Sequence, residues 1–375
     1  MVSELKKRQI KYFDYTLLFL VIFLLCFGLV MLYSVSTYDG QVTYGDAAYY
    51  LKKQLVYEVV GFLAMLFISF LNHRLFKKFA KLFYGISLIL CLLVFTPLGT
   101  THHESRRWLK IGGFEFQPSE LLKIAVVLML AAVISDMPKK VQKFKYVVVL
   151  AVMFVLVPTL VVFVSNASTA IIIAIIGFSV IFVANKWYLP FVALLGAGVG
   201  AGYLFLQFFA YRMERIEVWK NPEAYDKGYQ TMQGLYAIGS GGLFGKGLGN
   251  SMQKLGNIPE VQNDMVFAVV CEELGIFGAV CVILLFVLLL WRCMVVAMNA
   301  GSLFGSLTVT GIMVHIALQV LLNIAVVTNT IPNTGVTLPF FSYGGTSTML
   351  ILAEIGIVLS VSRNIKVDPG AGYEE

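Results

Sequence analysis

Charged residues are scarce in this chain: Asp, Glu, Lys and Arg make up only 13% of its 375 residues, whereas 59% are apolar. An ordinary soluble domain has about 25% charged and about 45–50% apolar residues. A soluble fold of this length cannot enclose so much apolar surface, but a bilayer can cover it, because lipid replaces water against the outer faces. The scarcity of charge therefore excludes an ordinary soluble domain and indicates an integral membrane protein.

Cysteine is also sparse, and no C-x-x-C pair occurs. The five cysteines all lie in apolar runs, where we expect buried small hydrophobes: Cys26, Cys91, Cys271, Cys281 and Cys293. Neither disulfides nor a zinc site are indicated. The adjacent His102 and His103 are a weak metal signal and are more typical of a solvated loop.

The net charge of +7 could suggest nucleic acid in a soluble protein. Here the basic residues flank apolar runs, which is the pattern that sets membrane orientation, so no nucleic-acid partner is expected. Residues 1–11 are basic and precede an apolar run without a small-residue cleavage site. We therefore expect a retained helix and not a signal peptide.

Runs of about 20 apolar residues, the length that spans a bilayer, predict an all-α polytopic protein of about ten transmembrane helices. The predicted spans are 15–36, 54–71, 79–98, 118–135, 146–164, 167–184, 187–209, 265–291, 303–328 and 344–362. No internal repeat and no soluble domain stand out, so residues 1–375 are expected to form one membrane domain. It has tails at 1–14 and 363–375 and one large loop, 210–264, between the seventh and eighth spans.

Lys and Arg gather in four segments that fall on one side of a ten-span chain. They are Lys6, Lys7, Arg8, Lys11, Arg74, Lys77, Lys78, Lys81, Lys139, Lys140, Lys143, Lys145, Arg363 and Lys366. Because positive loops stay cytoplasmic, both termini are predicted to be inside and the 210–264 loop outside. If 146–184 were one broken helix the later loops would invert, but the polar residues Asn166, Ser168 and Thr169 favour two helices.

Charged side chains inside apolar spans are costly and suggest function. The candidates are Glu58, Glu120, Lys123, Glu272, Glu273, His315 and Glu354. Glu120 and Lys123 share a helix face and can form either a neutral structural pair or part of a substrate cavity. Glu272 and Glu273 are adjacent, so at most one should face a given cavity. A lone His315 is more typical of hydrogen-bonded packing, and Glu58 and Glu354 have no assigned role.

Three outer segments carry unusual chemistry. Arg106, Arg107 and Lys110 precede a helix start at Pro118, and arginine forks bind phosphate. The Gly-rich YAIGSGGLFGKGLGN, which contains Lys246, could present backbone N–H groups to phosphate or could be a flexible loop. Asp264 directly precedes an apolar helix, where it is either a helix cap or a catalytic carboxylate at the membrane surface.

The segment 329–347, NTIPNTGVTLPFFSYGGTS, is broken by prolines and glycines. Irregular backbone at membrane depth is tolerated only where it is buried or lines a cavity. Ser342, Tyr343, Gly344 and Gly345 then open the last predicted helix, whose N-terminus favours an anion.

Taken together, RRWLKIGGFEFQPSELLK, YAIGSGGLFGKGLG, PEVQNDMVFAVVCEELG and TLPFFSYGGTS resemble the SEDS family of bacterial cell-wall proteins (FtsW, RodA and SpoVE). The resemblance covers nearly the whole chain in the right order. The form TLPFFSYGGTS is closer to the FtsW/SpoVE branch.

The resemblance implies a peptidoglycan glycosyltransferase of the bacterial cytoplasmic membrane that polymerises lipid II by inverting transfer, with undecaprenyl diphosphate as leaving group. It implies Asp264 as the catalytic carboxylate. Residues implied to bind substrate are Arg107, Glu120, Lys123, Arg215, Lys246, Glu272, Glu273, Ser342, Tyr343, Gly344 and Gly345. A divalent cation (Mg²⁺ or Mn²⁺) could assist, with no organic cofactor.

A class B penicillin-binding protein (a transpeptidase) and other divisome or elongasome membrane proteins are the implied partners. Two other classes stay open at this point: a flippase for lipid-linked oligosaccharide, and a non-catalytic scaffold that recruits a transpeptidase.

One departure from the family pattern lies between the fifth and sixth predicted spans. Many members have Gln-Pro-Asp-x-Gly-Thr there, whereas this chain has Ser165-Asn166-Ala167-Ser168-Thr169. The acidic residue is absent. We infer that its role is local structure, met here by Asn166 and Ser168, because Asn and Ser can cap a helix start as Asp does.

Overall fold

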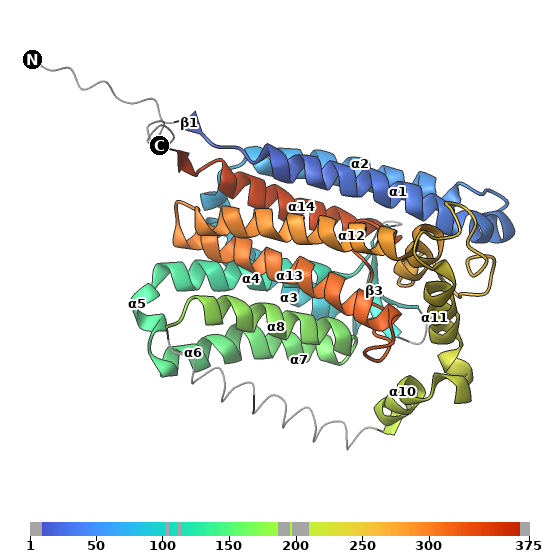
Figure 1. Cartoon of the computed structure of the whole chain (residues 1–375). Coiled ribbons are helices and arrows are strands. Elements are labelled where there is room, and N and C mark those ends of the chain that lie inside the picture. Colours follow the sequence, from blue (N-terminus) through green and yellow to red (C-terminus); the bar gives the residue numbers. More distant parts are fainter. Residues whose placement is uncertain (1–9, 103–104, 112–113, 187–195, 197–209, 368–375) are drawn as a thin grey trace, which may run out of the picture.

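The structure is a computed structural model that describes residues 10–102, 105–111, 114–186, 196 and 210–367. Most of these residues lie in long helices that run side by side (Figure 1). The long helices are α1 (Tyr15–Tyr44), α2 (Tyr49–Phe70), α3 (His73–Leu93), α4 (Pro118–Asp136), α8 (Ala167–Val183), α12 (Val266–Met298), α13 (Leu303–Val327) and α14 (Gly345–Ser362). Most of α4 is buried, and it packs against α3, α8 and α13, so it forms the centre of the bundle.

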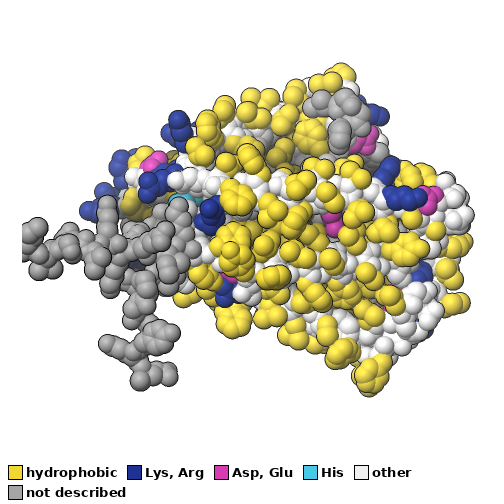
Figure 2. Space-filling view, turned by 90° about the horizontal axis from the view of Figure 1, so that it is seen from above, with side chains coloured by type: hydrophobic (Ala, Val, Ile, Leu, Met, Phe, Trp, Pro, Cys, Tyr) yellow, Lys and Arg dark blue, Asp and Glu magenta, His cyan; other side chains and the backbone are white. Residues whose placement is uncertain are grey.

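Seven of the described helices are long and apolar enough to cross a membrane, counting α6 to α7 as one, and α8 is a shorter apolar helix. Their outer faces are apolar: Figure 2 shows hydrophobic side chains covering the middle of one face, with charged side chains mainly toward its ends. Exposed examples are Phe19 on α1 and Leu63 and Phe67 on α2. Cys26 is exposed as well, contrary to our expectation, because an apolar run on a spanning helix also faces lipid. The prediction of a helical polytopic membrane protein is confirmed.

The fifth and sixth predicted spans are separate helices, as predicted. The fifth consists of α6 (Phe144–Ala151), a π-helical turn (Val152–Leu156) and α7 (Val157–Phe163). The chain breaks at Ser165, and α8 starts after Asn166, whose side-chain oxygen accepts from the Thr169 N–H at 3.2 Å. Asn166 thus caps α8, which confirms the cap inferred for it, whereas the structural role inferred for Ser168 stays a prediction. The predicted seventh span, 187–209, lies outside the described residues apart from position 196.

Several predicted boundaries are wrong. The predicted spans leave residues 37–53 as a loop between the first two helices. Most of these residues are helical, because α1 continues to Tyr44 and α2 begins at Tyr49. The basic residues of the predicted second loop lie inside α3, which begins at His73 because Asn72 caps it by accepting from the Arg74 N–H at 3.0 Å. Long basic side chains fit a helix end, since their stems lie along apolar surface while their charges reach water.

The outer segments are more ordered than predicted. Part of 99–117 forms a three-stranded antiparallel sheet of β2 (Gly99–His102), β3 (Ser105–Ile111) and β4 (Phe114–Phe116). The segment 210–264 contains α10 (Ala210–Lys220), α11 (Tyr229–Gly241) and two 3₁₀ turns (Pro222–Ala224 and Asp226–Gly228). These elements lie at one end of the bundle (Figure 1) and form the frame of the site described below.

The described ends of the chain meet at the other end of the bundle. There β1 (Ile10–Lys11) pairs antiparallel with β5 (Lys366–Val367), and the Arg292 guanidinium lies 2.7 Å from the Asp14 carboxylate. The short helix α5 (Pro138–Val141), with its lysines, lies at this end too (Figure 1). The basic segments and both described ends therefore share one end of the molecule.

The Asn166 cap gives a first testable prediction. Replacing Asn166 by Ala removes the acceptor for the Thr169 N–H, so we expect stability to fall by about 0.5–2 kcal/mol, seen as a lower thermal unfolding midpoint of the purified protein. Asn166→Asp should retain the wild-type midpoint, because a carboxylate caps equally well. Equal midpoints for the Ala variant and the wild type would contradict the capping role.

Candidate functional site

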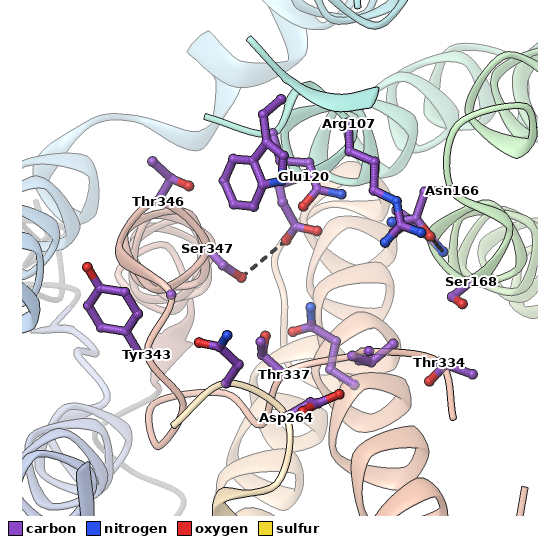
Figure 3. A pocket seen from close by; sticks show the side chains of 18 of the residues that line it. Arg107, Glu120, Asn166, Ser168, Asp264, Thr334, Thr337, Tyr343, Thr346 and Ser347 are labelled. Carbon is purple, nitrogen blue, oxygen red and sulfur yellow. Dashed lines mark hydrogen bonds between the residues drawn. The ribbon is translucent and has the colours of Figure 1, made fainter. Parts of the chain in front are cut away.

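A pocket of about 870 Å³ opens where the sheet, the irregular segment before α14 and the segment before α12 meet. Its walls come from segments far apart in the chain, and polar side chains converge on it from several directions (Figure 3). The lining includes Tyr57, Arg107, Trp108, Gln117, Glu120, Lys123, Asn166, Ser168, Gln230, Glu260, Asn263, Asp264, Gln319, Thr337, Tyr343, Gly344, Gly345 and Ser347.

Asp264 lies on one wall and is almost fully buried. Its backbone carbonyl accepts from the Asn323 Nδ2 of α13 at 2.8 Å, and its Oδ1 accepts from the Gln230 Nε2 of α11 at 3.3 Å. The capping alternative is wrong: α12 begins at Val266, and the residue before it, Met265, makes no side-chain cap. The backbone of Asp264 is therefore held by α13 and its carboxylate by α11, and the carboxylate faces the pocket.

The pKa of Asp264 is raised from 3.8 to about 6, chiefly by burial and to a smaller extent by the nearby Glu260 carboxylate, while the hydrogen bond from Gln230 opposes the shift. A carboxylate with such a pKa is deprotonated at neutral pH yet basic enough to accept a proton. This is the range in which a general base works best.

The opposite wall carries two cations. Arg107 extends from β3, and its Nε donates to the Ser165 carbonyl at 3.2 Å, beside the start of α8 (Figure 3). Lys123 is buried on α4, with its Nζ 2.8 Å from the Glu120 carboxylate, which confirms the predicted pair. Glu120 also accepts from the Ser347 hydroxyl of α14 at 3.3 Å. Both members of the pair also line the pocket. The two interpretations of Glu120 and Lys123, as a structural pair and as part of a cavity, are therefore both correct.

The irregular segment before α14 closes a third side. The Tyr343 N–H donates to the Gln262 carbonyl at 2.8 Å, so this segment is tied to the one that carries Asp264. Gly345 is the first residue of α14, and a Cβ there would lie 2.3 Å from the Tyr57 ring, so only glycine fits. Ser342 lies behind the pocket wall, where its hydroxyl accepts from the Leu338 N–H at 2.9 Å.

Besides Ser342, four predicted substrate residues do not line the pocket. Arg215 is exposed on α10. Lys246, Glu272 and Glu273 do not line the pocket; they belong to the attachment of the Gly-rich loop to α12.

The loop attachment is built from two ion pairs whose carboxylates are fully buried. The Lys246 Nζ lies 2.6 Å from Glu272, and the Lys254 Nζ lies 2.6 Å from Glu273. The Ser34 hydroxyl of α1 also donates to Glu273, at 2.7 Å. Gly275 interrupts α12 with a φ of 68°, which allows the loop backbone to approach its carbonyl groups closely. Glu272 and Glu273 point into the loop and not into the pocket, each toward its own lysine.

Sequence reasoning missed some residues that the structure brings to the site. Gln230 and Asn323 hold Asp264, yet neither stands in a recognisable pattern. Asn323 gave the clearer signal, since it is a polar residue inside an apolar span. His315 is hydrogen-bonded packing, as predicted: its Nδ1 lies 2.9 Å from Glu354, which gives that unassigned carboxylate a partner.

A divalent cation bound by the protein alone would need several acidic, His or Cys side chains close together. Within the described ranges, no three His, Cys, Asp or Glu side chains converge. The pocket's acidic side chains therefore do not fit a divalent ion held by the protein alone.

The chain matches the model of the FtsW/RodA/SpoVE family, described as cell cycle proteins, over residues 15–367. It is 39% identical over 355 residues to stage V sporulation protein E of Bacillus subtilis, covering 93% of this chain and 97% of that protein. It is 35% identical over 381 residues to a probable peptidoglycan glycosyltransferase FtsW of Trichlorobacter lovleyi, covering 98% of each.

Two solved structures have the same fold. One comes from a study of how a peptidoglycan synthase complex coordinates polymerization and crosslinking; it matches with a TM-score of 0.79 and 29% identity, over 95% of this chain and 99% of that one. The other is the rod shape determining protein RodA of Thermus thermophilus, with a TM-score of 0.69 and 27% identity, over 95% of this chain and 98% of that one.

Proposed function

The chain belongs to the FtsW/RodA/SpoVE family of cell cycle proteins, and from that premise we propose that it is a peptidoglycan glycosyltransferase that polymerises lipid II. The observation that carries the proposal is the pocket with a buried carboxylate of raised pKa on one wall and two cations on the other. Glycosyl transfer from a diphosphate carrier needs these two functions, a base for the acceptor and positive charge for the leaving group.

Asp264 is the general base in this mechanism. Its carboxylate takes the proton from the attacking sugar hydroxyl as the oxygen forms a bond to the anomeric carbon of the donor. The bond from that carbon to the diphosphate oxygen breaks in the same displacement, so the configuration inverts. Gln230 and Asn323 hold the base from two helices, which limits its movement and keeps it within reach of the hydroxyl.

The departing diphosphate meets Arg107 and Lys123. The N-termini of α8 and α14 also reach the pocket, through Ser168 and Gly345, and the unpaired N–H groups of a helix start favour an anion. Such stabilisation of developing charge is commonly the largest catalytic contribution. Ion pairing with Glu120 holds Lys123 in place at the pocket wall.

The charge pattern supports the proposed orientation. The end of the bundle with both described termini and the basic segments is cytoplasmic, and the pocket opens at the outer surface, where the lipid-linked sugar is exposed. A class B penicillin-binding protein is the proposed partner, in line with the similarity to a chain of a peptidoglycan synthase complex.

The direct test is glycan formation from purified lipid II, with and without the cognate transpeptidase and Mg²⁺ or Mn²⁺. Polymer under any of these conditions supports the proposal. Absence of polymer in all of them, from protein that unfolds cooperatively, would reject it. Translocation of labelled lipid II across vesicle membranes by the same preparation would instead identify a flippase. Absence of both activities would support a non-catalytic scaffold.

The raised pKa of Asp264 predicts the pH profile. Because the base must be ionised, kcat/KM should fall as the pH drops below about 6. The Glu260 charge helps to raise this pKa, so Glu260→Gln should lower it and shift the acid limb to lower pH. The measurement is the initial polymerisation rate from pH 4.5 to 8 for both proteins. An acid limb at the same pH in both would argue against Asp264 as the titrating base.

A further inference from the structure

Tyrosine rings form a continuous series at the outer ends of α1 and α2. The Tyr44 and Tyr49 rings are stacked with centroids 3.7 Å apart, and Tyr49 meets Tyr50 edge-on at 5.4 Å. Tyr50 in turn meets Tyr343 edge-on at 5.0 Å. We call Tyr44, Tyr49, Tyr50, Tyr57 and Tyr343 the tyrosine track.

The track begins in the reaction pocket. Tyr343 and Tyr57 both line it, and Figure 3 shows Tyr343 at the side opposite Asn166 and Ser168. Tyr57, Lys53 and Tyr49 follow one another at four-residue spacing on α2, so they share one face of that helix. The Lys53 Nζ lies 4.3 Å from the centre of the Tyr49 ring, which places a positive charge midway along the track.

The inner part of the track is held rigidly and the outer part is accessible. Tyr50 is buried, its hydroxyl donates to Asp39 at 2.6 Å, and it accepts from the Gln262 Nε2 at 3.2 Å. Tyr44, at the far end, is 49% exposed. A chain leaving the pocket along α2 would therefore pass from fixed rings onto a stacked pair in which Tyr49 is half-buried and Tyr44 is exposed.

The ordinary explanation for exposed tyrosines at this height is the aromatic belt, in which single rings anchor a helix at the headgroups. Belt rings need neither contact with one another nor continuity with a pocket. In this series Tyr44, Tyr49, Tyr50 and Tyr343 contact one another in turn, and Tyr343 and Tyr57 line the pocket itself, which favours a ligand that extends outward from the pocket.

We propose that the tyrosine track binds the glycan strand outside the reaction pocket, an inference that rests on the proposed function. Pyranose rings have apolar C–H faces that pack on aromatic rings, and hydroxyl groups that pair with tyrosine hydroxyls, so tyrosine is suited to both. Lys53 pairs with carboxylates of the stem peptides. Holding the strand between successive transfers would make the enzyme processive, and the track would set strand length without taking part in bond formation.

The first test compares strand length with reaction rate. The variants are Tyr44→Ala, Tyr49→Ala and their ring-preserving counterparts Tyr44→Phe and Tyr49→Phe, with Tyr15→Ala as control. Tyr15 is an exposed tyrosine at the other end of α1. For the track Ala variants we expect strands about fivefold shorter at an unchanged initial rate of lipid II consumption, since a lost ring contact accelerates release of the strand.

The Phe variants should shorten the strands less than the Ala variants, because they keep the ring and lose only the hydroxyl, and Tyr15→Ala should give strands of wild-type length. Wild-type strand lengths from both track Ala variants would overturn the proposal, and so would equal shortening by Tyr15→Ala, which would indicate interfacial anchoring.

A second test does not depend on activity. Soluble, uncross-linked glycan strands carrying stem peptides are titrated into the purified wild type and the double variant Tyr44→Ala, Tyr49→Ala, with binding measured by calorimetry. We expect binding by the wild type and at least about tenfold weaker binding by the double variant. Equal affinity, or no binding by the wild type, would overturn the proposal. An inactive protein that still binds strands through the track would reject the polymerase assignment alone.

Discussion

Replacing Asp264 by Asn should lower the rate of glycan polymerisation by about 10²–10⁴-fold, the usual contribution of a positioned general base. An amide of the same shape can still accept from Gln230 but cannot take a proton from the sugar hydroxyl. Substrate binding by Arg107 and Lys123 on the opposite wall should persist, so the loss should fall on kcat and not on KM. Steady-state kinetics on purified lipid II measure both constants.

Stability separates a chemical role from a structural one. The pKa of Asp264 is raised from 3.8 to about 6 in the folded protein, so the wild type loses stability as the pH rises through that interval, when the unfolded chain ionises first. Asp264→Asn lacks this penalty and should be at least as stable as the wild type at pH 7. Glu260→Gln, which removes an exposed carboxylate nearby, is the matched control and should retain polymerisation. Full activity in the Asp264→Asn variant would contradict the assignment of Asp264 as the general base.

Replacing Lys254 by Met should destabilise the protein by about 3–5 kcal/mol, because it leaves the fully buried Glu273 without its cation. Only neutral donors would remain to the carboxylate, the Ser34 hydroxyl and the Ser251 N–H. Since this pair ties the loop before Asp264 to α1 and α12, activity should fall together with the thermal unfolding midpoint.

Two controls make this second prediction specific. Lys77→Met removes the partly exposed pair with Asp136 and should cost at most about 1 kcal/mol. The double variant Lys254→Met, Glu273→Gln has no unpaired buried charge and should recover most of the lost stability. If the double variant were as unstable as Lys254→Met alone, the loss would reflect packing and not charge.

Apolar length and local chemistry predicted much of this fold. The starts of α4 at Pro118 and of α14 at Gly345 follow from a proline suited to a first turn and from glycines after a broken segment. The Glu120–Lys123 pair follows from helical spacing alone. The resemblance to family motifs identified Asp264, Arg107 and Lys123 as site residues. Only the fold shows that their three separate segments meet around one pocket.

Other features depend on contacts that no local pattern encodes. Lys254 lies in a Gly-rich loop, where its sequence neighbours are typical of a solvated charge. In the structure it is buried against Glu273, which lies nineteen residues further along the chain. The sheet around Arg107 escaped notice because its strands are short and one carries three basic residues, which obscures any alternation. The start of α3 was misplaced because charge was taken as a sign of loop, whereas a capped helix end accommodates it.

The ion pairs inside the bundle bear on how the protein responds to an energised membrane. Asp14 with Arg292, Glu120 with Lys123, Glu272 with Lys246 and Glu273 with Lys254 each sum to zero charge. A membrane potential acts on net charge, with about 2.3 kcal/mol for each elementary charge moved across 100 mV, so it performs no work on a pair that stays together. These four pairs therefore present no net charge on which a membrane potential could act.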